Sequence, residues 1–388
     1  MIDMTYDFDA IVDRRGTACE KWDGHYPGHP DALPLWVADM DFQAPPEVSA
    51  ALAERVAHGV YGYTFAQEED YATVVNWRQA RCGQVLQPEW ITFSSGVVCS
   101  LKAAVLAFTQ PGERVVVQPP VYPPFMRLTH DLGRQVVRNP LTQGPDGRWR
   151  MDLDHLEDCF RDGARMLLLC SSHNPVGRIW SPQELEQLAV LCQRYHVLVV
   201  ADEIHCDILR PGRLHTALGA LPGMEERVIT LVSATKTFNL AGLQNSVAVT
   251  ADAQLKRRLE KELFRTNHGT PNLFGMLAQR AAWQHGEGWL HQMNAYVAAN
   301  CDRARAMLSG QDRIVPNEPE GTYLLWLDCQ SLGMSDAALQ RFFVERCGVY
   351  PTMGKPYDAE GFVRLNLATR RAVVEQAVGR IVEEVGRL

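Results

Sequence analysis

The sequence VITLVSATKTFNLAGLQNS, residues 228–246, is the stretch that best indicates the fold. It opens with Val228 to Val232, an apolar run rich in β-branched residues, which is typical of a fully buried strand. Small and hydroxyl-bearing residues follow, and they end in a single lysine, Lys236. We therefore expect Lys236 to lie just past the end of a buried strand.

Lys236 at such a position has the chemistry of a reactive amine. Partial burial disfavours the charged form of a lysine and lowers its pKa, so the amine can serve as nucleophile and base. Ser233 and Thr235 are well placed to hydrogen-bond an anion such as a phosphate. The pattern S-x-x-K before a loop of small residues is typical of the lysine that forms a Schiff base with pyridoxal phosphate (PLP). A surface lysine after a core strand would give the same local pattern, so this stretch alone leaves both interpretations open.

The rest of the chain places Lys236 in an α/β fold. Four apolar runs, ending at positions 118, 170, 201 and 232, alternate with helical patterns. This alternation is typical of a large domain with a mostly parallel, doubly wound sheet. Ligands of such sheets bind outside the carboxyl ends of the strands. Side chains that could bind a ligand follow these ends, namely Tyr122, Asn174, Asp202, His205 and Lys236.

A possible phosphate site lies earlier in the chain. The sequence predicts a strand over 91–93, a turn at Ser94-Ser95-Gly96 and a helix over 97–108. A turn of this kind presents free backbone N–H groups and the positive end of a helix dipole to an anion. The element has one glycine and no P-loop lysine, and every strand-to-helix connection needs a turn. Phosphate binding and a plain turn are therefore both open.

Two other segments also have two interpretations. LPLWVADMDF, residues 33–42, is either an arm that packs on a neighbouring surface or a strap across a pocket. In the second case Ala38 is small because a ligand passes close to it. The proline-rich PPVYPPF, residues 119–125, holds Tyr122 in a rigid loop. There the ring either stacks on a flat heteroaromatic ligand or packs inward.

The chain is expected to form two parts. The large domain covers residues 46–285, and an N-terminal arm, residues 1–45, joins a smaller α+β domain over 286–388. In the smaller domain we predict strands over 321–329 and 362–368 and helices over 336–347 and 371–385. Arg370 and Arg371 stand at the start of the last helix, where the dipole disfavours cations. They therefore either bind a carboxylate or are simply solvated.

The composition narrows the classes of function. The net charge of −8 gives no reason to expect a nucleic acid or an anionic membrane surface as partner. No apolar run is long enough to cross a membrane, and the acidic start of the chain is not typical of a signal peptide. The ten cysteines are scattered without a C-x-x-C pair, as in a protein of the reducing cytoplasm. Asp-Glu-x-His-x-Asp at 202–207 matches no metal-binding spacing, so we expect no metal.

Nine segments spread over nearly the whole chain carry a family resemblance. They are WVADMDF (36–42), YGY (61–63), SSGVV (94–98), PPVYPPF (119–125), SSHNPVG (171–177), ADEIH (201–205), SATKTFNLAGLQ (233–244), PEGTYLLWLD (319–328) and FVRLN (362–366). Together they resemble the fold-type I PLP enzymes of the aminotransferase class I and II superfamily. Within that superfamily the chain looks most like the cystathionine β-lyase (C–S lyase) group typified by the MalY and PatB proteins.

The resemblance implies a set of cofactor contacts. Lys236 would form the Schiff base, Asp202 would pair with the ring nitrogen, and Tyr122 would stack on the ring face. Asn174 and His205 would hold the ring oxygen, although many relatives have a tyrosine at the position of His205. The phosphate would be bound by Gly96, Val97, Val98, Ser233, Thr235 and, from the other subunit of a homodimer, Tyr63.

The resemblance also implies an amino-acid substrate. Arg371 would bind its α-carboxylate, with Ala38 and Asn174 assisting. Relatives usually have Cys-Pro-Arg after the FVRLN strand, whereas this chain has Thr369-Arg370-Arg371, so Arg370 could take the role instead.

The implied reaction is an α,β-elimination with Lys236 as general base. Its substrate would be L-cystathionine, or cysteine or another S-conjugate, and its products a thiol such as L-homocysteine, pyruvate and ammonia. A PLP aminotransferase would use the same residues. A lyase with a secondary role as a protein-binding regulator is also compatible with the resemblance.

Overall fold

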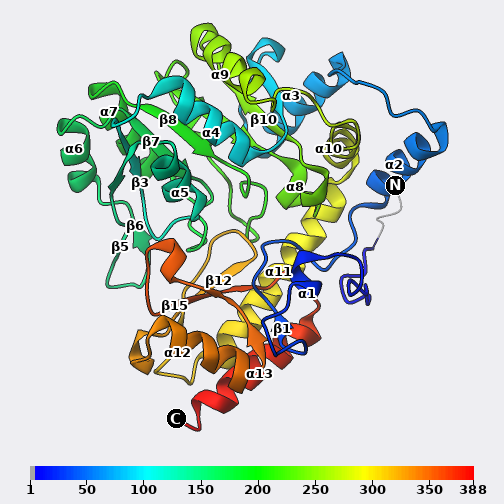
Figure 1. Cartoon of the computed structure of the whole chain (residues 1–388), viewed down its shortest axis with the longest axis vertical. Helices are drawn as coiled ribbons and strands as arrows, with labels where there is room; N and C mark the ends of the chain where they lie inside the picture. Colours follow the sequence, from blue (N-terminus) through cyan, green and yellow to red (C-terminus); the bar gives the residue numbers. More distant parts are fainter. Residues whose placement is uncertain (1–4) are drawn as a thin grey trace.

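A seven-stranded sheet forms the core of the upper part of the molecule in Figure 1, and the computed structural model describes residues 5–388. The strand order is β2-β10-β9-β8-β7-β3-β4. The strands are β2 (Ile91–Ser94), β3 (Arg114–Val117), β4 (Gln135–Arg138), β7 (Met166–Cys170), β8 (Leu198–Asp202), β9 (Val228–Val232) and β10 (Ser246–Val249). β10 is antiparallel to both of its neighbours, and the pairs from β9 across to β4 are all parallel. The expected mostly parallel sheet is therefore confirmed.

Helices cover both faces of this sheet, which is why its central strands β7, β8 and β9 are largely apolar. Along β3, Val116 packs in one hydrophobic cluster, whereas Val115 and Val117 pack in another on the opposite face. The first cluster includes side chains of α6 (Leu153–Arg161) and α7 (Pro182–Arg194). The second includes side chains of α4 (Val97–Phe108), α5 (Pro124–Asp131) and α9 (Ala253–Arg265).

A group of three further helices packs beyond β2 and β10. These are α2 (Pro46–His58), α3 (Glu68–Cys82) and α10 (Leu273–His285), and α10 packs against both of the others. Pro46 occupies the first position of α2, where its missing N–H costs nothing.

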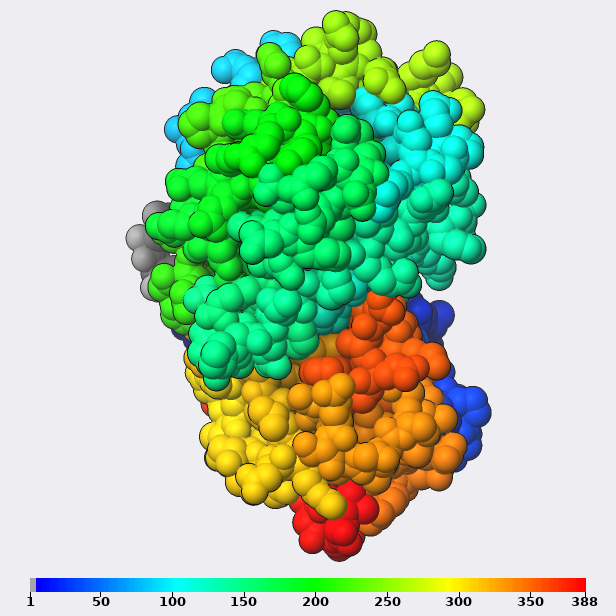
Figure 2. All heavy atoms as spheres, turned by 90° about the vertical axis from the view of Figure 1, so that its left-hand side faces the viewer, coloured from blue at the N-terminus to red at the C-terminus, as the bar shows by residue number. Residues whose placement is uncertain are grey.

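A second, four-stranded antiparallel sheet lies below the first in Figure 1. Its order is β11 (Val315–Pro316), β12 (Leu324–Asp328), β15 (Phe362–Asn366) and β14 (Thr352–Met353). α11 (Glu287–Leu308) and α13 (Arg371–Val385) pack on each other and share a hydrophobic cluster with this sheet. Figure 2 shows from the side how the orange and yellow C-terminal part lies beneath the green part. The division of the chain after residues 45 and 285 stays a prediction.

The N-terminal arm joins the C-terminal part through a short parallel pair. β1 (Leu33–Pro34) pairs with β13 (Val349–Tyr350). Ahead of β1 lies α1 (Glu20–Asp23), a single helical turn. The segment between β1 and α2 runs on towards the large sheet and carries residues 36–42.

Some elements depart from the sequence-based expectation. The predicted helix over 336–347 is α-helical only in α12 (Asp336–Arg341) and continues as a π-helical turn, Phe342–Arg346. The sequence analysis also missed α5, α6, β4 and the hairpin of β5 (Thr142–Gln143) and β6 (Trp149–Arg150). Across residues 5–388, none of the helices combines the length and the apolarity that spanning a membrane requires.

Candidate active site

Lys236 lies on α8 (Ala234–Thr237), a single helical turn that begins directly after β9. Every residue of β9 is buried, and the side chain of Ser233 caps the turn by accepting from the N–H of Thr235. Burial lowers the pKa of the Lys236 amine, although the nearby Asp39 carboxylate acts in the opposite direction. The prediction that Lys236 is a partly desolvated amine just past a buried strand is therefore confirmed.

Asp202 lies near Lys236 because β8 and β9 are adjacent and parallel, and Asn174 follows the end of the neighbouring β7. Asp202 ends β8, where it is paired in register with Cys170 of β7 and Leu231 of β9. The carboxyl group is almost fully buried, and this burial raises its pKa to about 7. A buried carboxylate is costly without a cationic partner. Asp202 therefore has the chemistry of a group that receives a protonated ring nitrogen.

Two more predicted residues face the same edge of the sheet. His205 is buried, and within the described residues its Nδ1 has no hydrogen-bond partner. Burial, together with the charges of Lys236 and Arg364, lowers the pKa of His205 to about 3, so the imidazole is neutral. Burial also raises the pKa of Tyr122, with a contribution from the Asp202 charge. These mutual effects place His205 and Tyr122 close to the Lys236–Asp202 pair.

The predicted phosphate site is built from α4 and α8 on either side of β10. Gly96 precedes α4, whose first backbone N–H groups, those of Val97 and Val98 among them, have no partner inside the helix. Ser233 Oγ lies 2.8 Å from Thr235 Oγ1 and donates to the backbone oxygen of Asn245 at 2.6 Å. The next residue is Ser246, the first of β10, and its Oγ lies 2.7 Å from that of Ser94 at the end of β2. This chain of hydroxyl contacts ties the two predicted halves of the site together.

The segment of residues 36–42, which we call the strap, contacts the lysine directly. The backbone oxygen of Ala38 accepts a hydrogen bond from Lys236 Nζ at 2.6 Å. It accepts a second from the hydroxyl of Tyr323 at 2.9 Å. Of the two interpretations of this segment, the structure favours a strap across the site. Tyr323, which is buried directly before β12, was not predicted as a site residue.

Arg371, the predicted carboxylate-binding residue, contacts side chains of α11. Its guanidinium lies 5.1 Å from the ring centre of Tyr296, and Nε donates to Asn300 Oδ1 at 3.4 Å. Its backbone N–H donates to the hydroxyl of Tyr296 at 2.8 Å. Arg371, the first residue of α13, is thus held against α11.

Arg364 is the arginine that the structure brings to the strand ends. It is buried in β15, and it donates to Asn174 Oδ1 at 3.1 Å and to the backbone oxygen of Trp36 at 2.8 Å. Its charge contributes to the lowered pKa of Lys236, and its own buried Nε has no partner among the described residues. Arg364 stands in the FVRLN segment, but we did not predict it as a site residue from the sequence. The signal was a cation in the middle of an apolar strand, which burial forbids unless something pairs with it.

The acidic residues that follow Asp202 are paired with protein groups. Glu203, Cys206 and His215 bring their potential ligand atoms within 4.8 Å of one another. However, the guanidinium of Arg78 already lies 2.6 Å from the Glu203 carboxylate and 3.5 Å from Cys206 Sγ. This buried cluster therefore joins α3 to the segment behind Asp202 through an ion pair.

The side chain of Tyr63 projects into solvent. Its side chain is fully exposed, as are much of Val60, Tyr61 and Phe65 around it. Its predicted place at the phosphate of a partner subunit stays a prediction.

Comparison with known proteins agrees with this arrangement. The family model for aminotransferase class I and II matches residues 33–381. The chain is 40% identical over 381 residues to cystathionine β-lyase PatB of Bacillus subtilis (strain 168), which covers 96% of this chain and 98% of that protein. Cystalysin from Treponema denticola, in a crystal structure that contains pyridoxal 5'-phosphate, matches with a TM-score of 0.95 and 30% identity over 99% of this chain and 100% of that one.

A third protein has a similar structure. The PLP-bound C–S lyase from Staphylococcus hominis matches with a TM-score of 0.92 and 30% identity, over 98% of each chain. The matches span nearly the whole chain and nearly the whole of each relative. The chain therefore belongs to the aminotransferase class I and II family.

Proposed function

We propose that the protein is a PLP-dependent C–S β-lyase. It cleaves L-cystathionine, or cysteine or another S-conjugate, by α,β-elimination to a thiol such as L-homocysteine, pyruvate and ammonia. The observation that carries the proposal is the amine of Lys236 beside the buried Asp202 carboxyl at adjacent strand ends. The 40% identity to cystathionine β-lyase PatB supports a lyase over the aminotransferases of the same family.

The residues at the strand ends fit PLP. Lys236 would hold the aldehyde carbon of PLP, and Asp202 would gain the cationic partner that its burial demands by pairing with the ring nitrogen. Asn174 and the unpartnered Nδ1 of His205 are available to the ring oxygen, and Tyr122 to the ring face. The backbone N–H groups at Gly96, Val97 and Val98, where α4 begins, and the hydroxyls of Ser233 and Thr235 would hold the phosphate. When bound, PLP supplies an electron sink that stabilises negative charge at the α-carbon of the amino acid.

Arg364 binds the α-carboxylate of the substrate. It is a buried cation whose Nε lacks a partner, and it already contacts Asn174 and the strap next to Ala38. A carboxylate that accepts two parallel N–H bonds from a guanidinium is held in a fixed orientation. Arg371, which is engaged with Tyr296 and Asn300, is the alternative that we test alongside.

Lys236 moves the protons of the reaction. Burial keeps its amine closer to neutral than that of an exposed lysine, so Nζ can take the proton from the substrate α-carbon. The departing thiolate then takes a proton from Lys236 Nζ or from the hydroxyl of Tyr122. Burial raises the pKa of Tyr122 and lowers that of Lys236, and both changes favour the protonated Lys236 amine as the proton donor.

A homodimer completes the site. The exposed Val60, Tyr61, Tyr63 and Phe65 form an apolar, aromatic surface that a second copy would cover. In that arrangement the hydroxyl of Tyr63 reaches the cofactor phosphate of the other subunit. The ten free cysteines also suit a reducing compartment, so we place the enzyme in the cytoplasm.

One sample tests the proposal. The visible spectrum of the purified protein is recorded, and release of pyruvate and free thiol from L-cystathionine is then followed in the same cuvette. Yellow protein with equal amounts of pyruvate and thiol is the expected result. Yellow protein that forms no pyruvate but turns over with an added keto acid would instead identify an aminotransferase. A colourless protein that takes up no added PLP would overturn the proposal.

A further inference from the structure

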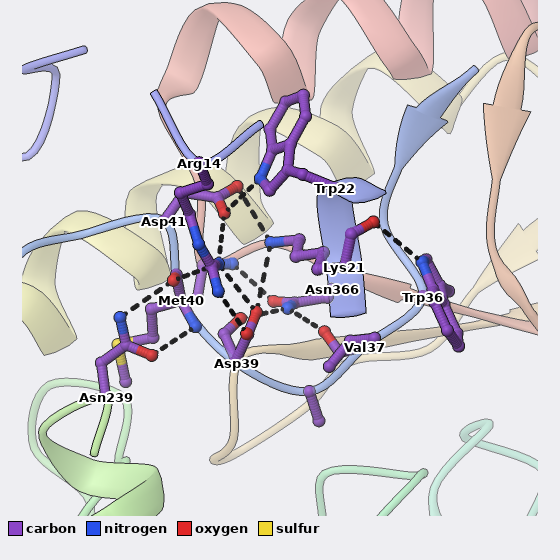
Figure 3. Close-up of polar contacts among 12 residues, drawn as sticks. Arg14, Lys21, Trp22, Trp36, Val37, Asp39, Met40, Asp41, Asn239 and Asn366 are labelled. Atoms are coloured by element: carbon purple, nitrogen blue, oxygen red, sulfur yellow. Dashed lines mark hydrogen bonds and ion pairs between the residues drawn. The ribbon is translucent and has the colours of Figure 1, made fainter. Parts of the chain in front are cut away.

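The strap is held on one side by the end of β15. The side-chain amide of Asn366 donates to the backbone oxygens of Val37 and Asp39, at 2.6 and 2.5 Å. Val37 and Asp39 flank Ala38 in the sequence, and Figure 3 shows both of them on the side chain of Asn366. The Ala38 oxygen is left to face the lysine.

The strap is held further along by the segment after α8. Asn239 accepts from the N–H of Met40 at 3.0 Å and donates to the backbone oxygens of Met40 and Phe42, at 2.9 and 2.8 Å. Because Asn239 follows Lys236 by three residues, the strap and the lysine share one local frame. A shift of the strap would therefore move the Ala38 oxygen relative to the Lys236 amine.

Two cations from the N-terminal arm close the strap from its other side. Arg14 donates to both carboxylate oxygens of Asp39, at 3.1 and 2.6 Å, and to Asp41 at 2.8 Å. Lys21, which is completely buried, donates to Asp41 at 2.9 Å, and so does the indole N–H of Trp22 at 2.8 Å. Figure 3 shows these side chains converging on the two carboxylates from the side opposite Asn239.

This cluster is electrically balanced, and each partner depends on the others. Two cations face two carboxylates, so their formal charges cancel. Burial opposes the charge on Arg14, but its bonds to Asp39 and Asp41 raise its pKa. Burial likewise opposes the charge on Asp41, and Lys21 nevertheless holds the pKa of that carboxyl below its usual range. Removing one cation would leave a carboxylate without its partner one residue from Ala38.

We propose that Arg14 is a positioning residue of the active site, which holds the strap through Asp39 so that the Ala38 oxygen stays on the Lys236 amine. This inference rests on the proposed function, since it concerns the lysine that binds PLP. Among the described residues the Arg14 guanidinium bonds to Asp39, Met40 and Asp41, and not to Lys236 or Tyr323. It acts through the strap.

The charge of Asp39 provides a measurable sign of this role. The charged groups that act on the Lys236 amine are Asp39 and Glu20 from the N-terminal part, Asp202 from β8 and Arg364 from β15. The neutral His205 and Tyr323 also lie against it, and both are buried. Asp39 raises the pKa of the amine, and Arg14 is its ion-pair partner. Removing Asp39 therefore lowers the pKa of the Lys236 amine, whereas removing Arg14 raises it.

The test is a charge cycle on the cofactor-free protein. The rate at which it takes up PLP, followed by visible absorbance, depends on the neutral lysine amine and is measured from pH 6 to 10. Arg14→Met is expected to move the half-maximal rate to higher pH by about 0.5 unit, and Asp39→Asn to lower pH by a similar amount. The double variant Arg14→Met/Asp39→Asn is expected to return close to the wild-type value, and Arg14→Lys to remain near it.

Two controls separate positioning from a loss of structure. Arg150→Met removes an arginine from an exposed ion pair with Asp146, far from the strap, and is expected to leave the uptake profile unchanged. In the PLP-loaded enzyme, Arg14→Met is expected to lower kcat about tenfold and to enlarge the isotope effect of an α-deuterated substrate, because proton transfer to a misplaced amine becomes slower.

The outcomes distinguish the inference from the function on which it rests. If Arg14→Met and Asp39→Asn shift the uptake profile in the same direction, or not at all, Arg14 does not act through Asp39 and the inference is wrong. If Arg14→Met does not fold, Asp39→Asn alone decides by the direction of its shift. If the wild-type protein takes up no PLP at any pH, the proposed function fails and the inference fails with it.

Discussion

Arg364 and Asn174 stand 190 positions apart in the sequence, yet the guanidinium donates to the side-chain oxygen of Asn174 at 3.1 Å. The contact joins β15 of the smaller sheet to the segment after β7 of the larger one. A side chain from one sheet is thereby added to the ligand-binding edge of the other. The first prediction concerns this arginine.

Arg364→Ala is expected to raise the KM for the amino-acid substrate about 10- to 100-fold, because charge-assisted hydrogen bonds to the α-carboxylate are lost. The visible spectrum of bound PLP should be nearly unchanged. Arg371→Ala is the matched comparison, and we expect it to change KM less than threefold. Steady-state kinetics on both variants decide the assignment: a large effect for Arg371→Ala and a small one for Arg364→Ala would reverse it.

Lys236→Ala is expected to lose the visible absorbance of covalently bound PLP and at least about a thousandfold in β-elimination, since no other amine at this site can take the α-proton. Spectroscopy and pyruvate release measure both effects. Lys102→Ala, on the exposed side of α4, is the matched control and should keep both properties. Turnover retained by Lys236→Ala would contradict the assigned role.

Asp202 predicts a pH dependence of stability in the cofactor-free protein. Its carboxyl keeps its proton up to about pH 7 when folded, whereas the unfolded chain releases it near the ordinary value of about 4. The folded state binds more protons between these values, so its contribution to stability is lost as the pH rises through that window. We expect the wild-type Tm to fall more between pH 5 and pH 8 than the Tm of Asp202→Asn. Equal falls in the two proteins would show that Asp202 is ionised in the folded state throughout.

Tyr63 predicts that two defective subunits can repair each other. Tyr63→Ala and Lys236→Ala are each expected to have little activity alone. In a mixed dimer one site receives Lys236 from the first chain and Tyr63 from the second, and is intact. After co-refolding of equal amounts, about a quarter of the wild-type activity should return, because half of the randomly formed dimers are mixed. No recovery, in a sample shown by mass to contain mixed dimers, would place Tyr63 outside the partner's site.

The large sheet and the lysine could be predicted because their signals are local. The run over 228–232 is buried on both faces, and Lys236 follows it by sequence alone. The side chains after β7 and β8 also follow from strand order, since parallel neighbours bring their carboxyl ends together. These inferences need only a strand, its end and the next few residues.

Two helices were missed although their start signals are present. α5 begins at Pro124, which looked like part of a rigid loop, yet proline is favoured in the first turn of a helix. α6 is capped by Asp152, whose side chain accepts from the N–H of His155. The prolines obscured the start of α5, and the short length of α6 obscured a capped helix.

The contacts of Arg364, Tyr323 and Arg14 could not be predicted, because each joins segments distant in the sequence. Arg364 lies in β15 and Tyr323 directly before β12, in segments whose sequences are typical of plain core, and their roles depend on how the two sheets meet. Arg14 lies in the N-terminal arm outside any helix or strand, and its contacts with Asp39 and Asp41 give it a role. Sequence patterns report local burial and periodicity, and these contacts depend on tertiary packing.

The anchoring of the strap also governs when the enzyme can become functional during its synthesis. The strap is made among the first residues, but Asn366 and the backbone oxygen of Ala368, which hold it, are among the last. A nascent chain that already contains Lys236 therefore still lacks the contacts that Asn366 and Ala368 make with the strap. Such sequence-distant pairing forms late and slowly. The reactive lysine acquires its final surroundings only once the ribosome has delivered β15 and the two ends of the chain have met.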